Sequence, residues 1–124
     1  LSINLINRIN SKIKVHLSDH DPMNCLIHGD LWSGNISTGL NEKGIIFDPS
    51  CWWADSEVDI AMTRLFGGFS ADFYNEYYKL VKEKDGSHKR STIYNFYHIL
   101  NHANMFGGSY INEVKNYIKM ILDM

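Results

Sequence analysis

The sequence has few of the features that mark several common classes of protein. Its 124 residues contain two cysteines, Cys25 and Cys51, which do not form a CxxC pair, so neither a disulfide framework nor a zinc site is expected. No apolar run approaches the ~20 residues that cross a bilayer, and no signal peptide opens the sequence. We therefore expect a cytoplasmic protein without a membrane partner.

An excess of charge of one sign is also missing. Twelve Lys and Arg residues face 14 Asp and Glu residues, the net charge is −2, and no run of basic residues occurs. We therefore expect no nucleic-acid partner. A chain of 124 residues is long enough for one domain with a hydrophobic core. Its first residue is Leu1 rather than Met, which leaves open a processed product and a piece of a longer chain.

The most frequent pattern in the sequence is the spacing of apolar residues that is typical of helices. Apolar residues spaced three and four apart predict an amphipathic helix over residues 2–17 and another helix over residues 89–106. Glycine pairs at 67–68 and 107–108 are expected to end two helices, because glycine adopts the left-handed conformation at low cost. Three further helices are expected where a serine can serve as the N-cap: Ser56 before residues 57–66, Ser70 before residues 71–82 and Ser109 before residues 110–121.

Short β-rich runs lie between the first helix and the later ones. "NCLI" (24–27) predicts a strand, and "NISTG" (35–39) with "KGIIFD" (43–48) predicts a hairpin. Beyond Pro49 the sequence is predicted to be helical. The expected fold class is α+β and mostly α, with a helix, a hairpin region and four more helices in one lobe.

Three polar residues flank the expected hairpin. Asp30 precedes it, Asn35 opens its first strand, and Asp48 ends its second. Because a hairpin returns its exit close to its entrance, these side chains can converge at one end. The oxygens of Asn35 and Asp48 suit Mg²⁺, which takes one or two carboxylates and leaves its other positions to water and phosphate. Asp30 lies earlier in the loop and is better placed as a base facing a hydroxyl.

This division of labour is that of phosphoryl transfer. In that template an Asp receives the acceptor proton, an Asn five residues further along binds metal, and a later Asp at the end of a strand binds metal. Asp30 and Asn35 have the D-x4-N spacing, and Asp48 follows the apolar run "IIF". The D-x4-N pattern alone is weak, but HGD-x4-N with a strand-terminal Asp at hairpin distance predicts a phosphotransferase.

The same residues resemble a known family. "HGDLWSGN" followed by "IIFDPS" is similar to the kinase-like superfamily of aminoglycoside and choline phosphotransferases. Within it, "DPSCWWADSEVDIAMTRLFGGF" and "YHILNHANMFGGSY" resemble the fructosamine kinase (ketosamine 3-kinase) family, from about Met23 to Tyr110. The resemblance implies the C-terminal lobe of a protein-kinase-like fold over residues 1–124, with a short β-hairpin catalytic region packed on a helical bundle.

The resemblance also implies an activity and roles for single residues. Members use ATP and Mg²⁺ to phosphorylate the 3-hydroxyl of a small-molecule or protein-bound ketoamine, in protein deglycation. Residue by residue, it implies a catalytic base at Asp30, metal ligands at Asn35 and Asp48, a sugar wall at Trp32, an acceptor-site residue at His102, and loop support from His28 and Asp59.

One part of the family pattern is missing. Such kinases carry an N-terminal lobe with a Gly-rich loop and a lysine that reach the ATP phosphates. Here the first glycine is Gly29, and Lys12 and Lys14 lie on the predicted helix 2–17 rather than on a strand. We therefore expect a C-terminal lobe that transfers no phosphate at a useful rate by itself.

Two other functions stay open. One is a kinase of the same superfamily with another acceptor, such as choline or an aminoglycoside; the other is a non-catalytic, truncated metal-binding module. Structural explanations also remain for single residues: Trp52 and Trp53 are expected to pack under the loop. His98 and His102 are spaced i, i+4, but they lack a third ligand of the right kind, so zinc is not expected.

Overall fold

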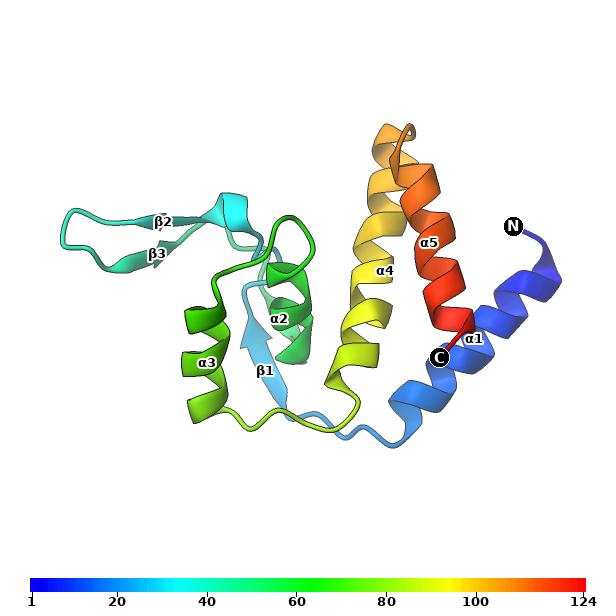
Figure 1. Cartoon of the computed structure of the whole chain (residues 1–124), viewed down its shortest axis with the longest axis horizontal. Helices are drawn as coiled ribbons and strands as arrows, with labels where there is room; N and C mark the ends of the chain where they lie inside the picture. Colours follow the sequence, from blue (N-terminus) through cyan, green and yellow to red (C-terminus); the bar gives the residue numbers. More distant parts are fainter. The chain divides into compact units, whose positions relative to one another are not determined.

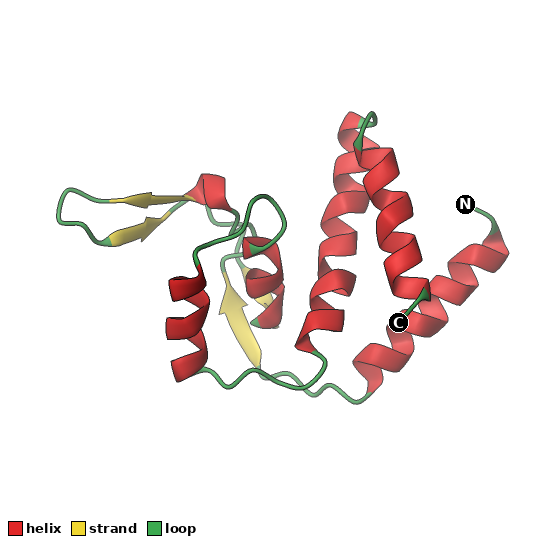
Figure 2. Cartoon of the chain, viewed as in Figure 1, coloured by secondary structure: helices red, strands yellow, loops and turns green.

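The computed structural model describes residues 1–124, which form two compact units. One unit combines Leu1–Asp21 with His88–Met124, and the other is Pro22–Ser87. The secondary structure is mostly helical with two small two-stranded antiparallel sheets (Figures 1 and 2). The expected class, α+β and mostly α, is confirmed. The assignment of all 124 residues to one kinase C-terminal lobe stays a prediction.

The first unit consists of helices. They are α1 (Ile3–Ser18), α4 (Ser87–Phe106) and α5 (Tyr110–Leu122). In Figure 1, α4 and α5 run side by side, and the Phe96 and Tyr117 rings stack between them with centroids 6.4 Å apart and planes 11° apart. The apolar core contains one residue of α1, one of α4 and two of α5: Ile9, Phe96, Ile118 and Ile121.

In helix α1, some of the regularly spaced apolar residues that predicted the helix pack into the core and others do not. Ser2 caps the helix by accepting a hydrogen bond from the Leu5 N–H at 3.3 Å. Ile9 is buried and Ile13 packs against the core, whereas Ile3 is 78% exposed. The periodicity therefore predicted the helix correctly, and Leu5, Ile9 and Ile13 are the residues of its apolar stripe that contribute to the core of this unit.

The connection between α4 and α5 is a glycine turn, as predicted. Gly107 and Gly108 have φ values of 60° and 57°, in the left-handed region that glycine adopts at low cost. The Gly107 N–H donates to the Ala103 carbonyl at 2.9 Å, which ends α4. Ser109 stands at the N-cap position of α5, but its side chain makes no capping hydrogen bond, so the prediction that it caps the helix was wrong.

The second unit contains both sheets. Strand β1 (Asn24–Ile27) pairs with β4 (Trp52–Asp55), and Leu26 lies opposite Trp53. Strands β2 (Ile36–Thr38) and β3 (Gly44–Ile46) form the predicted hairpin, which extends away from β1, α2 and α3 in Figure 1.

Strand β4 corrects the expectation that the chain turns helical directly after Pro49. Helix formation is delayed until residue 57 because residues 52–55 supply the antiparallel partner that β1 needs for its backbone hydrogen bonds. Two consecutive tryptophans with high strand propensity were the available signal.

Two helices complete this unit. α2 (Glu57–Thr63) and α3 (Ala71–Leu80) are shorter than predicted. Ser70 caps α3 by accepting from the Phe73 N–H at 3.3 Å, as predicted. Ser56 makes no capping hydrogen bond; the Asp55 carboxylate accepts from the Glu57 N–H at 3.0 Å instead. Across both units, no helix is long and apolar enough to pass through a bilayer.

Candidate functional site

The candidate site is the loop between β1 and β2, residues 28–35. It turns sharply at Gly29, whose φ is +81°. A Cβ atom built there would lie 2.0 Å from the Ser50 carbonyl oxygen, and the Ser50 N–H donates to the His28 carbonyl at 2.8 Å. Conformation and space therefore both require glycine at this position. The loop is held directly against the segment that leads into β4.

A single carboxylate binds the first two amides of the loop. Asp59, in the first turn of α2, accepts from the His28 N–H at 2.7 Å and from the Gly29 N–H at 2.9 Å, one amide on each oxygen. Hydrogen bonds to an ionised acceptor are among the stronger ones in proteins. The contact fixes the start of the loop on α2.

The charge of the same carboxylate affects the pKa of Tyr77, on α3. Burial raises the pKa of its phenol, a hydrogen bond with Ser56 lowers it, and nearby negative charges, including that of Asp59, raise it further. The phenol is therefore neutral at physiological pH, and it adds no second negative charge beside Asp59.

His28 is buried and joins two backbone segments. Its Nε2 lies 2.9 Å from the Phe47 carbonyl oxygen, and its Nδ1 accepts from the Asp30 N–H at 3.3 Å. These two bonds fit the neutral tautomer in which Nε2 carries the hydrogen and donates to Phe47. The ring thus links the loop to the end of β3 and has no ring nitrogen directed to an open surface.

Asp30 and Asn35 form the centre of the site. The Asn35 amide nitrogen donates to the Asp30 carbonyl oxygen at 2.8 Å and to its Oδ2 at 2.9 Å. Asn35 ends a short 3₁₀ turn, Ser33–Asn35, and is 7% exposed. The two residues of the D-x4-N pattern therefore meet side chain to side chain, and the amide group is oriented by both bonds.

Asp48 lies directly beyond the hairpin. Ile36 pairs with Ile46, and the Phe47 N–H donates to the Asn35 carbonyl at 3.1 Å, so Asn35 and Asp48 leave the same end of the ladder. Asp48 is exposed and has φ +51°. Non-glycine residues in the left-handed region are uncommon and concentrate at functional sites.

Asn35 and Asp48 remain the predicted ligands of a hard cation. Because the Asn35 amide nitrogen is directed to Asp30, its Oδ1 is the atom of this side chain left for a metal. Asn35 Oδ1 and the Asp48 carboxylate are both oxygen donors, the kind that Mg²⁺ prefers, and their joint binding of one ion stays a prediction. The remaining metal positions would belong to water and phosphate.

Trp32 projects from the loop beside the 3₁₀ turn and is 38% exposed. Its ring meets Phe66 edge to face, with centroids 6.1 Å apart and planes 82° apart. Ser33 Oγ donates to the Phe66 carbonyl at 3.1 Å. Phe66 was not among the predicted site residues; the available signal was its place in the "LFGG" run, which carried part of the family resemblance.

His102 belongs to the other unit, on α4. Its Nδ1 lies 2.8 Å from the His98 carbonyl oxygen, and its ring lies 5.7 Å from that of Phe106 and 5.2 Å from that of Tyr110. Its role at the acceptor site stays a prediction. Trp52 and Trp53, expected to pack under the loop, are 53% and 68% exposed. Trp52 nevertheless lies against the loop, since its Cδ1 is 3.1 Å from a Cβ atom built at Gly29; for Trp53 the expectation stays a prediction.

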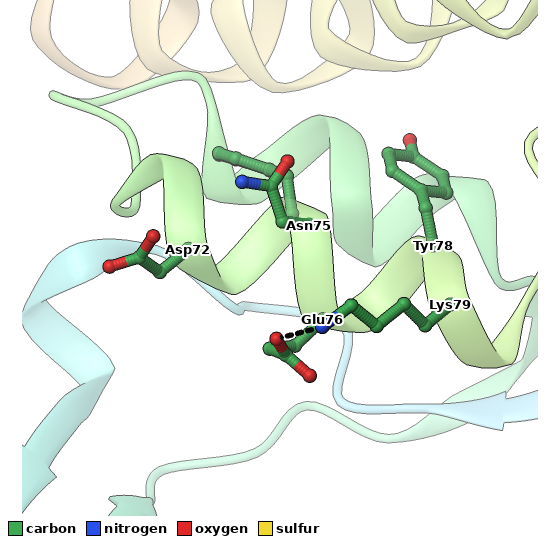
Figure 3. A pocket seen from close by; sticks show the side chains of 6 residues that line it. Asp72, Asn75, Glu76, Tyr78 and Lys79 are labelled. Atoms are coloured by element: carbon green, nitrogen blue, oxygen red, sulfur yellow. Dashed lines mark hydrogen bonds and ion pairs between the residues drawn. The ribbon is translucent and has the colours of Figure 1, made fainter.

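A concave surface lies along α3. It has a volume of about 520 Å³ and is lined by Asp72, Tyr74, Asn75, Glu76, Tyr78 and Lys79. Figure 3 shows its side chains spread along the helix, with Glu76 and Lys79 paired. None of the predicted site residues lines it, so the candidate site remains the 28–35 loop with the hairpin.

Known proteins resemble this chain along most of its length. The family model for fructosamine kinase matches residues 1–124. The "Probable ketoamine kinase" of Vibrio parahaemolyticus is 49% identical over 111 residues, covering 89% of this chain and 38% of that protein. The ketosamine-3-kinase of Mus musculus is 36% identical over 122 residues, covering 95% and 39%.

A comparison with solved structures gives the same family. The crystal structure of a "Putative fructosamine-3-kinase" from Haemophilus somnus aligns with a TM-score of 0.83 at 32% identity, over 98% of this chain and 41% of that one. This chain thus spans 38%, 39% and 41% of the three proteins' lengths. From end to end of its 124 residues, the chain belongs to the fructosamine kinase family.

Proposed function

We propose that this chain is the C-terminal lobe of an ATP-dependent ketosamine 3-kinase and carries its catalytic site. The observation that supports this most is the contact between Asp30 and Asn35, at 2.9 Å between side chains, beside a hairpin that Asp48 follows. That arrangement agrees with the phosphoryl-transfer template, and the chain belongs to a kinase family.

In this proposal Asp30 is the catalytic base. Asn35 occupies its Oδ2, so Oδ1 accepts the hydrogen of the acceptor's 3-hydroxyl. The hydroxyl oxygen attacks the γ-phosphorus of ATP, the bond from that phosphorus to the β,γ-bridging oxygen breaks, and ADP leaves. The proton passes to Asp30, and the product is a 3-phosphate ester.

The proposed metal ligands are Asn35 Oδ1 and the Asp48 carboxylate. Bound Mg²⁺ would supply neutralising charge to the phosphates. The chain's own contribution is orientation, since Asn35 is held by Asp30 and Asp48 follows a hydrogen-bonded ladder. His28 and Asp59, which bind the loop backbone and its neighbours, are proposed to keep it in this conformation.

The proposed acceptor is a ketosamine, of the fructosamine or ribulosamine type, free or protein-bound. Two relatives are named as kinases of ketoamines or ketosamines, which favours this class over choline or aminoglycosides. Trp32 is proposed as the wall for the sugar because an indole face suits the apolar C–H face of a carbohydrate. His102 is proposed as a second acceptor-site residue.

We further propose that residues 1–124 alone do not transfer phosphate. The chain spans 38% and 39% of the lengths of two relatives, and within residues 1–124 the first glycine is Gly29, so these residues do not themselves supply a Gly-rich phosphate loop ahead of the catalytic loop. An enzyme without a clamp on the ATP phosphates loses the positioning on which phosphoryl transfer depends.

The test uses a chimera in which residues 1–124 replace the matching segment of the Vibrio parahaemolyticus relative. With ATP and Mg²⁺, the chimera should phosphorylate fructosyl-lysine or ribulosyl-lysine at the 3-hydroxyl, as seen by phosphorus NMR. Choline and kanamycin should remain unphosphorylated. Removing Mg²⁺ with a chelator should abolish the reaction.

The Asp30→Asn chimera should lose about 10²- to 10⁴-fold in kcat, the usual contribution of a general base. The matched control is Asp72→Asn, an exposed carboxylate on α3, which should keep its rate. Nearly full activity of Asp30→Asn would contradict the role of Asp30. Repeated turnovers by residues 1–124 alone would contradict the need for further sequence.

A further inference from the structure

The orientation of the Trp32 indole is set by contacts outside its own side chain. Trp32 stands at the N-cap position of the 3₁₀ turn, and its ring lies across Gly34: a Cβ atom added to Gly34 would come within 2.2 Å of Trp32 Cη2. The φ of Gly34 is not in the left-handed region, so space rather than conformation keeps this position small. Gly34 therefore supports the indole from one side.

Phe66 supports it from another. The two rings meet edge to face at 6.1 Å, a favoured geometry that directs the positive edge of one ring to the negative face of the other. The hydrogen bond from Ser33 Oγ to the Phe66 carbonyl, 3.1 Å, holds the two backbones together beside the ring contact.

Phe66 belongs to the segment Arg64–Phe69, here called the 64–69 loop, which α3 holds at both ends. The Phe69 N–H donates to the Tyr74 hydroxyl at 3.3 Å, and the Tyr74 hydroxyl lies 3.1 Å from Thr63 Oγ1. Thr63 Oγ1 in turn donates to the Ile60 carbonyl at 2.7 Å. The hydrogen bonds therefore form a chain in one direction: Phe69 donates to the Tyr74 hydroxyl, and Tyr74 donates to Thr63 Oγ1.

Two further contacts fix the start of this loop. The Arg64 guanidinium carbon lies 4.7 Å from the centroid of the Tyr74 ring, a cation–π distance, and Arg64 donates to the Tyr78 hydroxyl at 3.3 Å. After Phe66 the chain reverses through Gly67 and Gly68, with φ of 102° and 65°. Phe66 therefore stands at the tip of a loop whose two ends are fixed to Tyr74.

We propose that the 64–69 loop is a positioning element for acceptor recognition: through Phe66 it orients the Trp32 indole that faces the sugar. Phe66 itself touches no reacting atom and acts through Trp32. The inference rests on the proposed function in one respect, the use of Trp32 as the sugar wall.

The first experiment does not depend on catalysis. In residues 1–124 carrying Trp52→Phe and Trp53→Phe, Trp32 is the only indole. Phe66→Leu, which keeps an apolar side chain but removes the ring, should abolish the ring-current shifts of the Trp32 protons in NMR spectra and speed the decay of its fluorescence anisotropy. Phe66→Tyr should preserve both signals. Tyr74→Phe, which removes one hydroxyl at the anchor, should change them in the same direction but less.

The matched control is Tyr97→Leu, an exposed aromatic residue on α4, which should leave the Trp32 signals unchanged. Unchanged Trp32 signals in Phe66→Leu would overturn the proposal. Because thermal unfolding is recorded for each variant, a protein that has lost its fold is recognised; Phe66→Tyr and Tyr74→Phe, which keep the ring, then decide the question.

The second experiment measures acceptor kinetics in the chimera. Phe66→Leu should raise KM for the ketosamine about three- to tenfold, the size of an aromatic pair, with kcat and KM for ATP within about twofold. Gly34→Ala, which displaces the indole from the other side, should act in the same way, and Phe66→Tyr should restore the original KM.

The outcomes separate the two proposals. If the chimera phosphorylates no ketosamine, the proposed function fails, while the NMR experiment still decides whether Phe66 orients Trp32. If the chimera is active and Phe66→Leu changes KM for ATP and for the acceptor equally, the loop has only a general structural role and the inference is overturned.

Discussion

The helices α1, α4 and α5 bury Ile9, Phe96, Ile118 and Ile121 in one apolar cluster. Residues 22–87 also bury apolar side chains, but hydrogen bonds from polar side chains hold the candidate loop. In the second unit, Asp59 binds two loop amides, His28 joins the loop to Phe47, and Asn35 is bound to Asp30. Several of its large apolar side chains remain exposed, including Leu26, Trp53 and Ile46.

The difference shows how a small protein positions a site. Apolar packing is non-directional and tolerates shifts of the chain, which suits a helical scaffold. Hydrogen bonds from charged or buried groups to particular amides are directional, and they can hold a loop at the geometry that chemistry requires. Variants in the two units should therefore fail in different ways.

The largest effect on stability is expected in the helical unit. Ile121 is fully buried, so Ile121→Ala should lower the free energy of unfolding by about 2–5 kcal/mol through lost burial and a cavity. Urea unfolding measures the loss, and hydrogen exchange should accelerate first in α1, α4 and α5. The neighbouring exposed residue offers the control: Met120→Ala should cost less than about 0.5 kcal/mol. Equal losses for the two variants would remove the argument for a core here.

A smaller loss is expected at the loop glycine. Gly29→Ala must place a Cβ near the Ser50 carbonyl at a positive φ, which should cost about 2–3 kcal/mol through strain and a weakened hydrogen bond. Gly44→Ala is the matched control, because no atom lies within 4 Å of the added carbon. Urea unfolding of both variants checks the difference, and a tolerated alanine at 29 would show that the turn is not needed.

The next variant tests the polar contacts directly. Asp59→Asn replaces one accepting oxygen with an NH₂ group that must face an amide hydrogen of His28 or Gly29, so the free energy of unfolding should fall by about 1–2 kcal/mol. Hydrogen exchange at these two amides should rise while α1 and α5 keep their protection. If protection in the helical unit falls as much as in the loop, the two units do not respond separately.

The smallest effect compares two serines that the sequence makes equivalent. Ser70 accepts a capping hydrogen bond in α3, while Ser109 makes none in α5. Ser70→Ala should therefore cost about 0.5–1 kcal/mol, and Ser109→Ala should be close to neutral. Chemical unfolding of the pair is the measurement; a larger loss at Ser109 would reverse the assignment of the caps.

Much of the fold could be predicted because the signals are local. The i, i+3 and i, i+4 pattern identified α1 and α4, and the β2–β3 hairpin followed from two short apolar runs around a turn. The two tryptophans of β4 were a local signal for a strand, but its pairing with β1 could not be predicted, because β1 lies 25 or more residues earlier in the sequence. The failed caps at Ser56 and Ser109 have a similar cause, since backbone conformation at a cap depends on how the chain arrives there.

In the candidate site, too, local sequence signals identified some residues, and contacts between distant segments involve others. Sequence spacing singled out Asp30, Asn35 and Asp48, and a family resemblance added His28, Trp32, Asp59 and His102; their chemical roles stay predictions. Phe66 was missed because nothing in its local sequence indicates that it meets Trp32, more than thirty residues away.

The order of residues alone determined the family, the helical character and the D-x4-N spacing, because these depend on residue identity and on periods of a few residues. Only the tertiary structure decided that one carboxylate on α2 holds two amides of the loop, that β4 pairs with β1, and that Phe66 faces the indole. Each of these joins segments distant in the chain, and such contacts form only when folding brings their backbones within hydrogen-bonding or van der Waals distance.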